Sequence, residues 1–164
     1  MLLFAALSSF FVAAVLANLN GLAGFNGRAD TPMIEDVTLE LDADWYLFPF
    51  TNVGVPVPIN FIVNTPFTPL TIIQLTDLYC IGDRFVLSST GGPLFVPLPT
   101  TVVTPDLECT ISTNNATLAY LSTLWSHAGA TLAVPGAQYN FTVTPLVSPF
   151  SAGVAAIRFA TFAP

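Results

Sequence analysis

Residues 131–162 read TLAVPGAQYNFTVTPLVSPFSAGVAAIRFATF and contain runs of strand-forming residues separated by turn-forming ones. The runs cover residues 131–134, 139–144 and 154–162. Pro135-Gly136 separates the first two, and Ser151-Ala152-Gly153 precedes the third. Gly and Pro mark turns, whereas β-branched and aromatic residues favour strands. This stretch therefore predicts consecutive short β-strands.

The same pattern extends upstream. Val37, Leu39 and Leu41 alternate with polar residues, which is the period of a strand with one solvent-facing side. Five acidic residues nearby are expected to form a solvated face: Glu35, Asp36, Glu40, Asp42 and Asp44. Further strands are predicted at residues 45–50, 59–63, 70–75, 84–88 and 94–98.

One segment departs from the strand pattern. In residues 115–125, Leu118, Leu121 and Trp125 are spaced three and four apart, which is typical of one face of a short helix, and a Ser/Thr/Asn cluster precedes it as a possible cap. Short strands punctuated by Pro and Gly indicate an all-β fold. We therefore expect an antiparallel β-sandwich or jelly roll with one short helix, forming a single domain over residues 34–164.

The N-terminus predicts export. Residues 1–17, MLLFAALSSFFVAAVLA, are typical of a secretory signal peptide and are too short for a membrane span, which needs roughly 20 apolar residues. We therefore expect a secreted, extracellular protein with no stable membrane span. Residues 18–33 are rich in Gly and Asn, and we interpret them as a flexible N-terminal arm.

Composition excludes several classes of protein. The chain is 53% hydrophobic and 8% charged, which is the opposite of a disordered sequence. Its net charge is -7 and its pI is about 4.1, with Arg28, Arg84 and Arg158 as the only Lys or Arg residues. Such a surface repels phosphate backbones and anionic lipids, so nucleic-acid binding is not expected.

Two features fit an extracellular location. Cys80 and Cys109 are the only cysteines, and an oxidising compartment favours one disulfide between them, worth roughly 3.5 kcal/mol by loop-entropy arguments. Asn115-Ala116-Thr117 and Asn140-Phe141-Thr142 match the N-glycosylation pattern. In a eukaryotic source we therefore expect a glycoprotein modified at Asn115, Asn140 or both.

Several segments together resemble small secreted fungal proteins of unassigned function. The segments are Thr76-Asp77-Leu78-Tyr79-Cys80-Ile81-Gly82-Asp83-Arg84-Phe85, the preceding WYLFPF at 45–50, Cys109, and the closing SPFSAGVAAIR at 148–158. The resemblance covers roughly residues 37–162. It departs at Ser89-Thr90-Gly91-Gly92, where that family has an Asn-Gly or Asp-Gly hairpin, and at Ala137-Gln138, where a His is common. It implies a compact, secreted β-sandwich and brings no activity with it.

Candidate chemistry centres on the cysteines. Asp77 and Asp83 flank Cys80, and Glu108 precedes Cys109, so a disulfide would bring these carboxylates into one neighbourhood. They are candidates for a Ca²⁺ site or for the acid pair of a glycosidase. The structural interpretation is favoured, in which Asp77 binds its own turn and Asp83 and Glu108 pair with Arg84. No other cofactor is expected.

His127 is the only histidine and has no nucleophile signature beside it, so a structural role is favoured. The aromatic residues at 45–50 could form a sugar-stacking platform, but a core position is favoured for Tyr46, Phe48 and Phe50, with Trp45 on the opposite face of the strand. The positions of Tyr120 and Trp125 are less constrained by the sequence. The predicted function is a non-catalytic, secreted binding or structural module for surface polysaccharide or protein, with self-assembly through strand edges as a further possibility. The alternative is a secreted hydrolase that uses a carboxylate pair.

Overall fold

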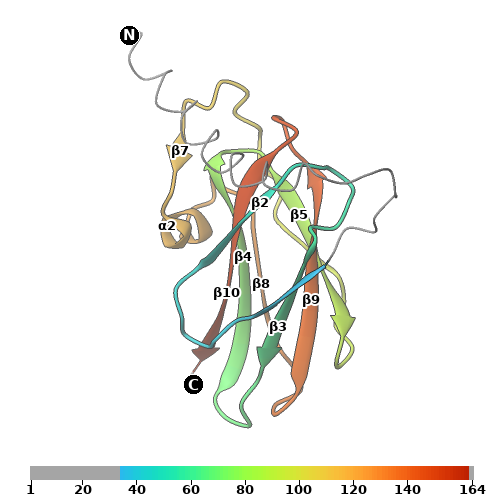
Figure 1. Cartoon of the computed structure of the whole chain (residues 1–164). Helices are drawn as coiled ribbons and strands as arrows, with labels where there is room; N and C mark the ends of the chain where they lie inside the picture. Colours follow the sequence, from blue (N-terminus) through green and yellow to red (C-terminus); the bar gives the residue numbers. More distant parts are fainter. Residues whose placement is uncertain (1–33, 163–164) are drawn as a thin grey trace, which may run out of the picture. The chain divides into compact units, whose positions relative to one another are not determined.

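A computed structural model describes residues 34–162, and the predicted signal peptide (1–17) and N-terminal arm (18–33) lie outside the described residues. Two β-sheets face each other across a hydrophobic core (Figure 1). The prediction of an all-β sandwich is confirmed. In strand order, the first sheet consists of β1 (Glu35–Thr38), β3 (Ile59–Asn64), β9 (Gln138–Val147), β5 (Arg84–Gly91) and β6 (Leu98–Pro99).

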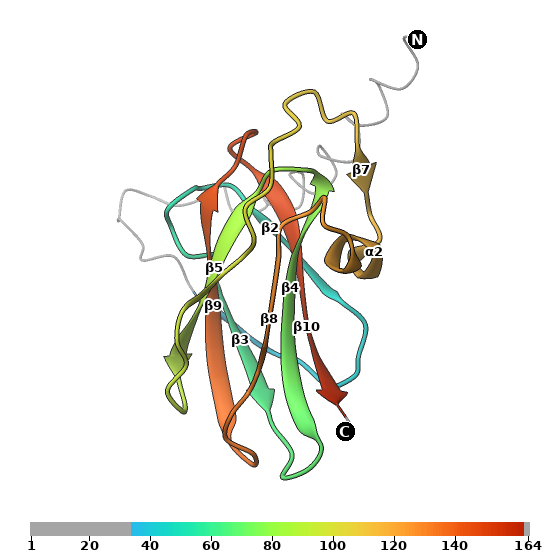
Figure 2. The ribbon, with the colours of Figure 1, turned by 180° about the vertical axis from the view of Figure 1, so that it is seen from behind.

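The second sheet runs on the other side of the core. Its strands are β2 (Tyr46–Phe50), β10 (Gly153–Phe162), β4 (Leu70–Cys80) and β7 (Ser112–Thr113), and β8 (His127–Thr131) pairs with another part of β4. Figure 2 shows β8 and β4 side by side from behind. The pairing of named strands is antiparallel except between β1 and β3, which run parallel.

The core follows from the alternation of the long strands. In β9, Tyr139, Phe141 and Val143 are buried, and the residues between them are half-buried on the outer face. In β10, Ala155, Ile157 and Phe159 meet them from the opposite sheet as members of the same cluster. Side chains that alternate along a strand face opposite sides of the sheet, so each strand contributes every second residue to the space between the sheets.

A second, smaller core lies beneath the only helix in the described part of the chain, α2 (Ala116–Leu121). Ala119 packs there against Leu78 and Ala156, which face outward from the second sheet, and Trp125 completes the cluster. Trp125 is only 4% exposed, so it is a core residue. The helix is shorter than the segment predicted at 115–125 because the chain turns at Ser122.

Two predicted strands differ from the observed ones. The strand predicted at 94–98 is reduced to Leu98–Pro99, because Leu94 and Val96 are exposed and find no neighbouring strand. The strand predicted at 131–134 lies instead at His127–Thr131, where the small residues Ala128, Gly129 and Ala130 pair with β4. Their low side-chain volume hid this strand from a search for β-branched and aromatic runs.

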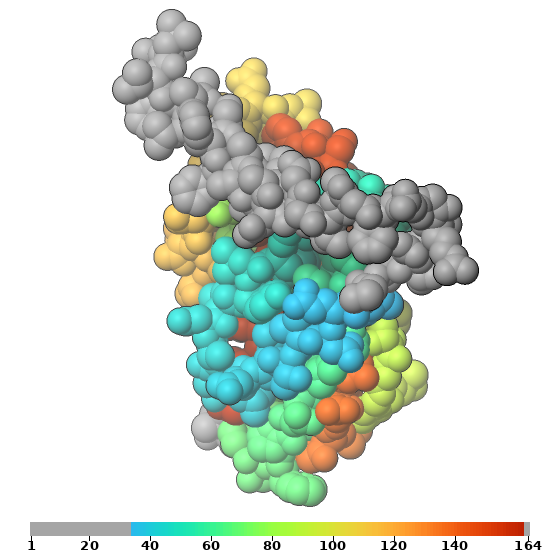
Figure 3. Space-filling view, viewed as in Figure 1, coloured from blue at the N-terminus to red at the C-terminus, as the bar shows by residue number. Residues whose placement is uncertain are grey.

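The segment from β1 to β2 passes from the first sheet to the second and covers one open side of the sandwich. Leu39 and Leu41 pack against the core, and Leu41 forms an isolated bridge with Phe159 of β10. In the space-filling view this segment, coloured blue to cyan, lies across the front of the strands (Figure 3). The five acidic residues between 35 and 44 are exposed, as predicted.

Most outer strands of the two sheets are short or contain proline, whereas the outer strand β8 has 5 residues and no proline. β1 has 4 residues, β6 has 2 and includes Pro99, and β2 includes Pro49. Proline lacks the backbone N–H that a further strand would need. Among residues 34–162 no helix has the length and apolar character needed to cross a membrane.

Candidate functional site

The predicted disulfide is present. Cys80 lies at the end of β4 and bonds to Cys109, with 5.0 Å between their Cα atoms. Cys109 lies in the loop that follows β6, so the bond fixes this loop to one end of the sandwich. The backbone N–H of Asp106 also donates to the carbonyl of Ile81 at 3.0 Å. The loop and the β4–β5 turn therefore form one unit.

Asp77 organises the β4–β5 turn from the inside. Its side chain is fully buried, and its Oδ2 accepts hydrogen bonds from the N–H groups of Gly82 and Asp83, each at 3.1 Å. Gly82 has φ of 133°, and a Cβ there would meet Pro105 and Pro149 within 2.9 Å, so this turn requires glycine. The interpretation that Asp77 binds the backbone of its own turn is confirmed.

Asp83 is buried beside Asp77, at 2% exposed. A Cβ added to Gly153 would lie 2.1 Å from Asp83 Oδ2 and 2.7 Å from the Phe50 ring, so the carboxyl group packs directly on the Gly153 backbone. Oδ1 of Asp77 and Oδ1 of Asp83 are both buried, and neither has a hydrogen-bond partner among residues 34–162. The β4–β5 turn thus encloses two adjacent acids.

The burial of these acids changes their protonation. Burial, followed by the charge of Asp83, raises the pKa of Asp77 to about 8, and three backbone hydrogen bonds only partly offset this. Burial also raises the pKa of Asp83 to about 6, opposed by Ser148 and Asp77. The Ser148 hydroxyl approaches Asp83 without the geometry of a full hydrogen bond. Burial and the neighbouring acid therefore both favour the protonated form of Asp77.

The arrangement does not suit the chemistry for which these acids were candidates. A glycosidase pair flanks a bond of its substrate, and here both carboxyl groups are buried between the sheets and the turn. Glu108 is exposed and does not join them, and within residues 34–162 no group of three or more His, Cys, Asp or Glu side chains is placed to hold a metal ion. Asp83 approaches Asp77 and Ser148, and not Arg84 as expected.

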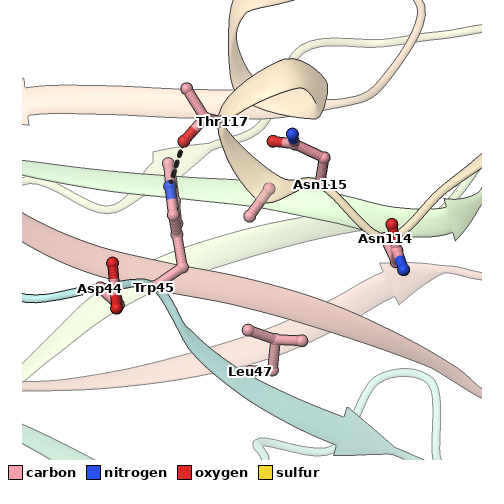
Figure 4. A pocket seen from close by; sticks show the side chains of 7 residues that line it. Asp44, Trp45, Leu47, Asn114, Asn115 and Thr117 are labelled. Carbon is pink, nitrogen blue, oxygen red and sulfur yellow. Dashed lines mark hydrogen bonds between the residues drawn. The ribbon is translucent and has the colours of Figure 1, made fainter.

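A different feature faces solvent on the second sheet, next to α2. It is an open hollow of about 370 Å³, lined by Asp44, Trp45, Leu47, Asn114, Asn115, Ala116 and Thr117. Figure 4 shows the indole of Trp45 donating from Nε1 to the Thr117 hydroxyl, at 2.9 Å, across one side of it. Asp44, Asn114 and Asn115 add a carboxylate and two amides to the lining, with Asp44 beside Trp45 and Asn114 at the opposite end (Figure 4). We call this feature the Trp45 hollow.

The indole of Trp45 is held from several sides. The guanidinium carbon of Arg158 lies 4.5 Å from the ring centroid, and Arg158 Nε donates to Gln74 Oε1. The Tyr120 ring lies 5.7 Å away, and Tyr120 in turn packs edge-on against His127. Because the Arg158 cation covers one indole face, this Trp is a rigid wall rather than a free stacking platform.

The other aromatic candidates and His127 have structural positions. Phe48 and Phe50 are buried in the main core, and Tyr46 packs against Phe61, as favoured from the alternation. His127 Nδ1 lies 3.1 Å from the carbonyl of Trp125, which accepts a hydrogen bond from it. Sequence reasoning missed Asp44 as part of the hollow, because its nearness to Asn114 joins segments far apart in the chain. It also missed Arg158 as the residue that covers the Trp45 ring, because that contact depends on the pairing of β2 with β10.

The two glycosylation sequons lie in different surroundings. Asn115 is exposed and caps α2: its Oδ1 accepts from the N–H of Leu118 at 2.9 Å, which leaves Nδ2 outside the cap. Asn140 is half-buried on the outer face of β9, with Oδ1 buried and Nδ2 against Gly91. Asn115 is the more accessible acceptor, and glycosylation of either site stays a prediction.

No family model matches the chain, and no curated protein matches it. Among solved structures, the pre-peptidase C-terminal domain of a collagenase from Bacillus anthracis is similar with a TM-score of 0.38 and 12% identity, over 82% of this chain and 99% of that one. CorA, a surface-associated copper-binding protein of Methylomicrobium album BG8, is similar with a TM-score of 0.46 and 8% identity, over 79% and 99%. These similarities concern the strand arrangement alone.

Proposed function

We propose that this protein is a secreted, non-catalytic module that binds extracellular polysaccharide through the Trp45 hollow. One observation carries the proposal: the hollow is open to solvent and combines polar side chains with the indole of Trp45, which is held in place by its hydrogen bond to Thr117. Carboxylate, amide and hydroxyl groups bind the hydroxyl groups of sugars by hydrogen bonds, and binding sites place a few such groups on a rigid surface. The net charge of -7 favours a neutral polymer over an anionic one.

The rigidity of the lining supports recognition without large rearrangement. Asn115 is fixed by the cap of α2, and Thr117 by the indole N–H. Trp45 is fixed in turn by Arg158 and Tyr120. A site that is ordered before binding loses less conformational entropy when the ligand arrives. The hollow therefore needs only a few hydrogen bonds for measurable retention on an insoluble polymer, where many sites lie close together.

A binding screen tests the proposal. The purified protein, exported through the bacterial periplasm with its disulfide intact, is mixed with insoluble chitin, β-glucan and cellulose, and the bound fraction is measured. We expect retention on one polymer and a loss of roughly tenfold in affinity for Asp44→Ala, which removes a charged hydrogen-bond partner. Glu40→Ala is the matched control, because Glu40 is also an exposed acid before β2 and does not line the hollow.

The other outcomes each have a meaning. Absence of retention on all three polymers overturns the polysaccharide proposal and favours a protein ligand. Retention that Asp44→Ala leaves unchanged moves the site away from the hollow. Adding Ca²⁺ or a chelator is expected to change nothing. Release of reducing sugars during incubation would instead support the alternative, a hydrolase. Repeating the screen on protein from a glycosylating host shows whether a glycan on Asn115 blocks the hollow.

A further inference from the structure

The disulfide-bearing end of the sandwich holds two acids that have no basic partner among residues 34–162. Asp77 comes from β4 and Asp83 from the β4–β5 turn, and neither forms an ion pair in this described part of the chain. The elements packed against them contribute few polar groups. Ser148 approaches from the segment before β10, Gly153 and Phe50 supply backbone and ring, and the Ser126 hydroxyl donates to the carbonyl of Asp83.

Within the described residues, none of the nearby charged groups pairs with these acids. Arg84 follows Asp83, but its Nε is buried without a hydrogen-bond partner and it does not lower either pKa. Asp106 receives hydrogen bonds from Thr110 and Ile111 in its own loop. His127 binds the Trp125 carbonyl and packs on Tyr120. The two buried carboxyl groups therefore depend on each other and on a proton.

Two acids packed this closely cannot both carry a charge without a large cost, because burial penalises each charge and the like charges repel. A proton on Asp77 removes one charge and supplies a donor for the other acid. Oδ2 of Asp77 is already occupied by two N–H groups, so the free oxygen is Oδ1, which the structure leaves without a partner.

We propose that Asp77 and Asp83 share one proton and thereby form an acid-stabilised lock, which holds the disulfide-bearing end of the sandwich closed in mildly acidic surroundings and loosens as the pH rises. When the proton leaves to solvent, the turn contains two like charges. This turn holds two other parts of the chain. The loop after β6 is joined to it by the Cys80–Cys109 bond and by the hydrogen bond from Asp106 N–H to the Ile81 carbonyl. The residue before β8 is joined to it by the hydrogen bond from Asp77 N–H to the Ser126 carbonyl.

The direction of the pH effect follows from linkage. An unfolded Asp has the ordinary pKa of 3.8, so the folded protein binds more protons than the unfolded chain above that pH. The stabilisation is complete below about pH 3.8 and is lost as the pH rises through about 6 and then about 8. Each proton held only by the folded state changes the unfolding constant by about tenfold per pH unit.

The experiment combines two measurements on the exported protein with its disulfide intact. Carboxyl ¹³C NMR shifts of the Asp residues are followed from pH 3 to pH 9, and urea unfolding is recorded at pH 5 and pH 7. We expect two aspartates to titrate far above the others, in two coupled steps. We also expect the unfolding constant to rise about 1000-fold between the two pH values, about 100-fold from Asp77 and about tenfold from Asp83.

Variants separate the lock from a general pH effect. Asp77→Asn keeps an acceptor for the two N–H groups and replaces the protonated oxygen with an amide donor, so it should fold and flatten the pH dependence. Asp83→Asn provides a second isosteric test if Asp77→Asn folds poorly. Asp106→Asn, which changes a half-buried acid in the bonded loop whose pKa is lowered, is the control and should retain the wild-type slope between pH 5 and 7.

Three results would overturn the proposal: ordinary titration of all aspartates near pH 4, an unfolding constant independent of pH between 5 and 7, or an unchanged slope in both Asn variants. Each of these outcomes is independent of polymer binding. Failure of the lock therefore leaves the proposed function standing, and failure of the binding screen leaves the lock standing.

Discussion

Two turns joined by the disulfide are each built around an aspartate, with opposite electrostatics. In the β4–β5 turn, Asp77 accepts from the N–H groups of Gly82 and Asp83. In the loop before β7, Asp106 accepts from the N–H groups of Glu108 and Ile111 and from the Thr110 hydroxyl. Hydrogen bonding lowers the pKa of Asp106, which is only half-buried, whereas burial raises the pKa of the fully buried Asp77 to about 8.

The difference shows that the surroundings of a turn aspartate, more than its hydrogen bonds, determine its charge. Both carboxyl groups collect backbone donors, which favour the ionised form. Asp106 remains in water and keeps that preference. Asp77 loses its water and gains a second acid as a neighbour, and these terms outweigh its hydrogen bonds. One bond, Cys80–Cys109, therefore connects a turn stabilised by acid to a loop stabilised by ionisation.

The largest effect is expected from cutting that connection. The double variant Cys80→Ser/Cys109→Ser frees the loop and should lower the free energy of unfolding by roughly 3.5 kcal/mol, from loop-closure entropy. Urea unfolding of the variant and the wild type measures the difference. Hydrogen exchange then sharpens the comparison: amides around Asp106 should lose protection, while those of Gly82 and Asp83 keep theirs. An equal loss of protection at the amides of both turns would show that both turns depend on the disulfide to the same extent.

A steric change at Gly153 should break the buried turn alone. In Gly153→Ala the new methyl group would lie 2.1 Å from Asp83 Oδ2 and 2.7 Å from the Phe50 ring, so the acid pair must move. Overpacking of this kind costs about 3 kcal/mol at the upper end of its usual range. Thermal unfolding at pH 5 measures the cost. Gly54→Ala is a control with open space around its Cβ, although its φ of 79° adds backbone strain.

Removing the central carboxyl of the buried turn is expected to cost less. Asp77→Ala leaves the N–H groups of Gly82 and Asp83 without their acceptor in a buried site. We expect it to lower the free energy of unfolding by about 2 kcal/mol. Asp77→Asn retains the acceptor and should cost much less at pH 7. If the two variants were equally destabilised in urea, the hydrogen bonds to the backbone would not be what holds this turn.

The smallest effect is expected in the exposed loop, with the opposite pH dependence. The folded-state pKa of Asp106 is lowered, so its contribution is present above about pH 3.8 and is lost as the pH falls below that value. Asp106→Asn should therefore lower the melting temperature slightly at pH 6 and not at pH 2.5. A melting temperature that differs from the wild type most at low pH would contradict this assignment.

The sequence predicted the sandwich because its long strands alternate clearly. Each of these strands has large apolar residues at every second position, which predicts one buried face: Phe141 and Val143 in β9, and Ile157 and Phe159 in β10. The strand at His127–Thr131 was missed, because Ala and Gly carry little strand preference and its pairing comes from the backbone of β4. The predicted cap was a Ser/Thr/Asn cluster in front of residue 115, and the structure uses Asn115 itself, directly after that cluster.

The candidate sites were less predictable. Nearness of Asp77, Asp83 and Cys80 in the sequence indicated a shared neighbourhood, and the structure confirms it for the two aspartates. Their complete burial depends on Phe50 and Gly153 from other strands, which no local pattern specifies. The Trp45 hollow likewise requires β2 to meet the segment before α2. Which distant segments meet depends on the order of the strands within each sheet. Turn-forming residues in the sequence show where strands end, but they do not determine that order.

The short, proline-containing outer strands affect how this protein behaves in concentrated solution. The chain has a mean hydropathy of +0.71, and Leu94, Val96 and Leu121 are among its exposed apolar side chains. Such a surface promotes aggregation by adding strands at sheet edges, as in amyloid. β6 with Pro99 and β2 with Pro49 offer an incoming strand few backbone N–H groups to pair with. At high protein concentration these two edges therefore resist strand addition, and β8, an outer strand of 5 residues without proline, is the edge left for it.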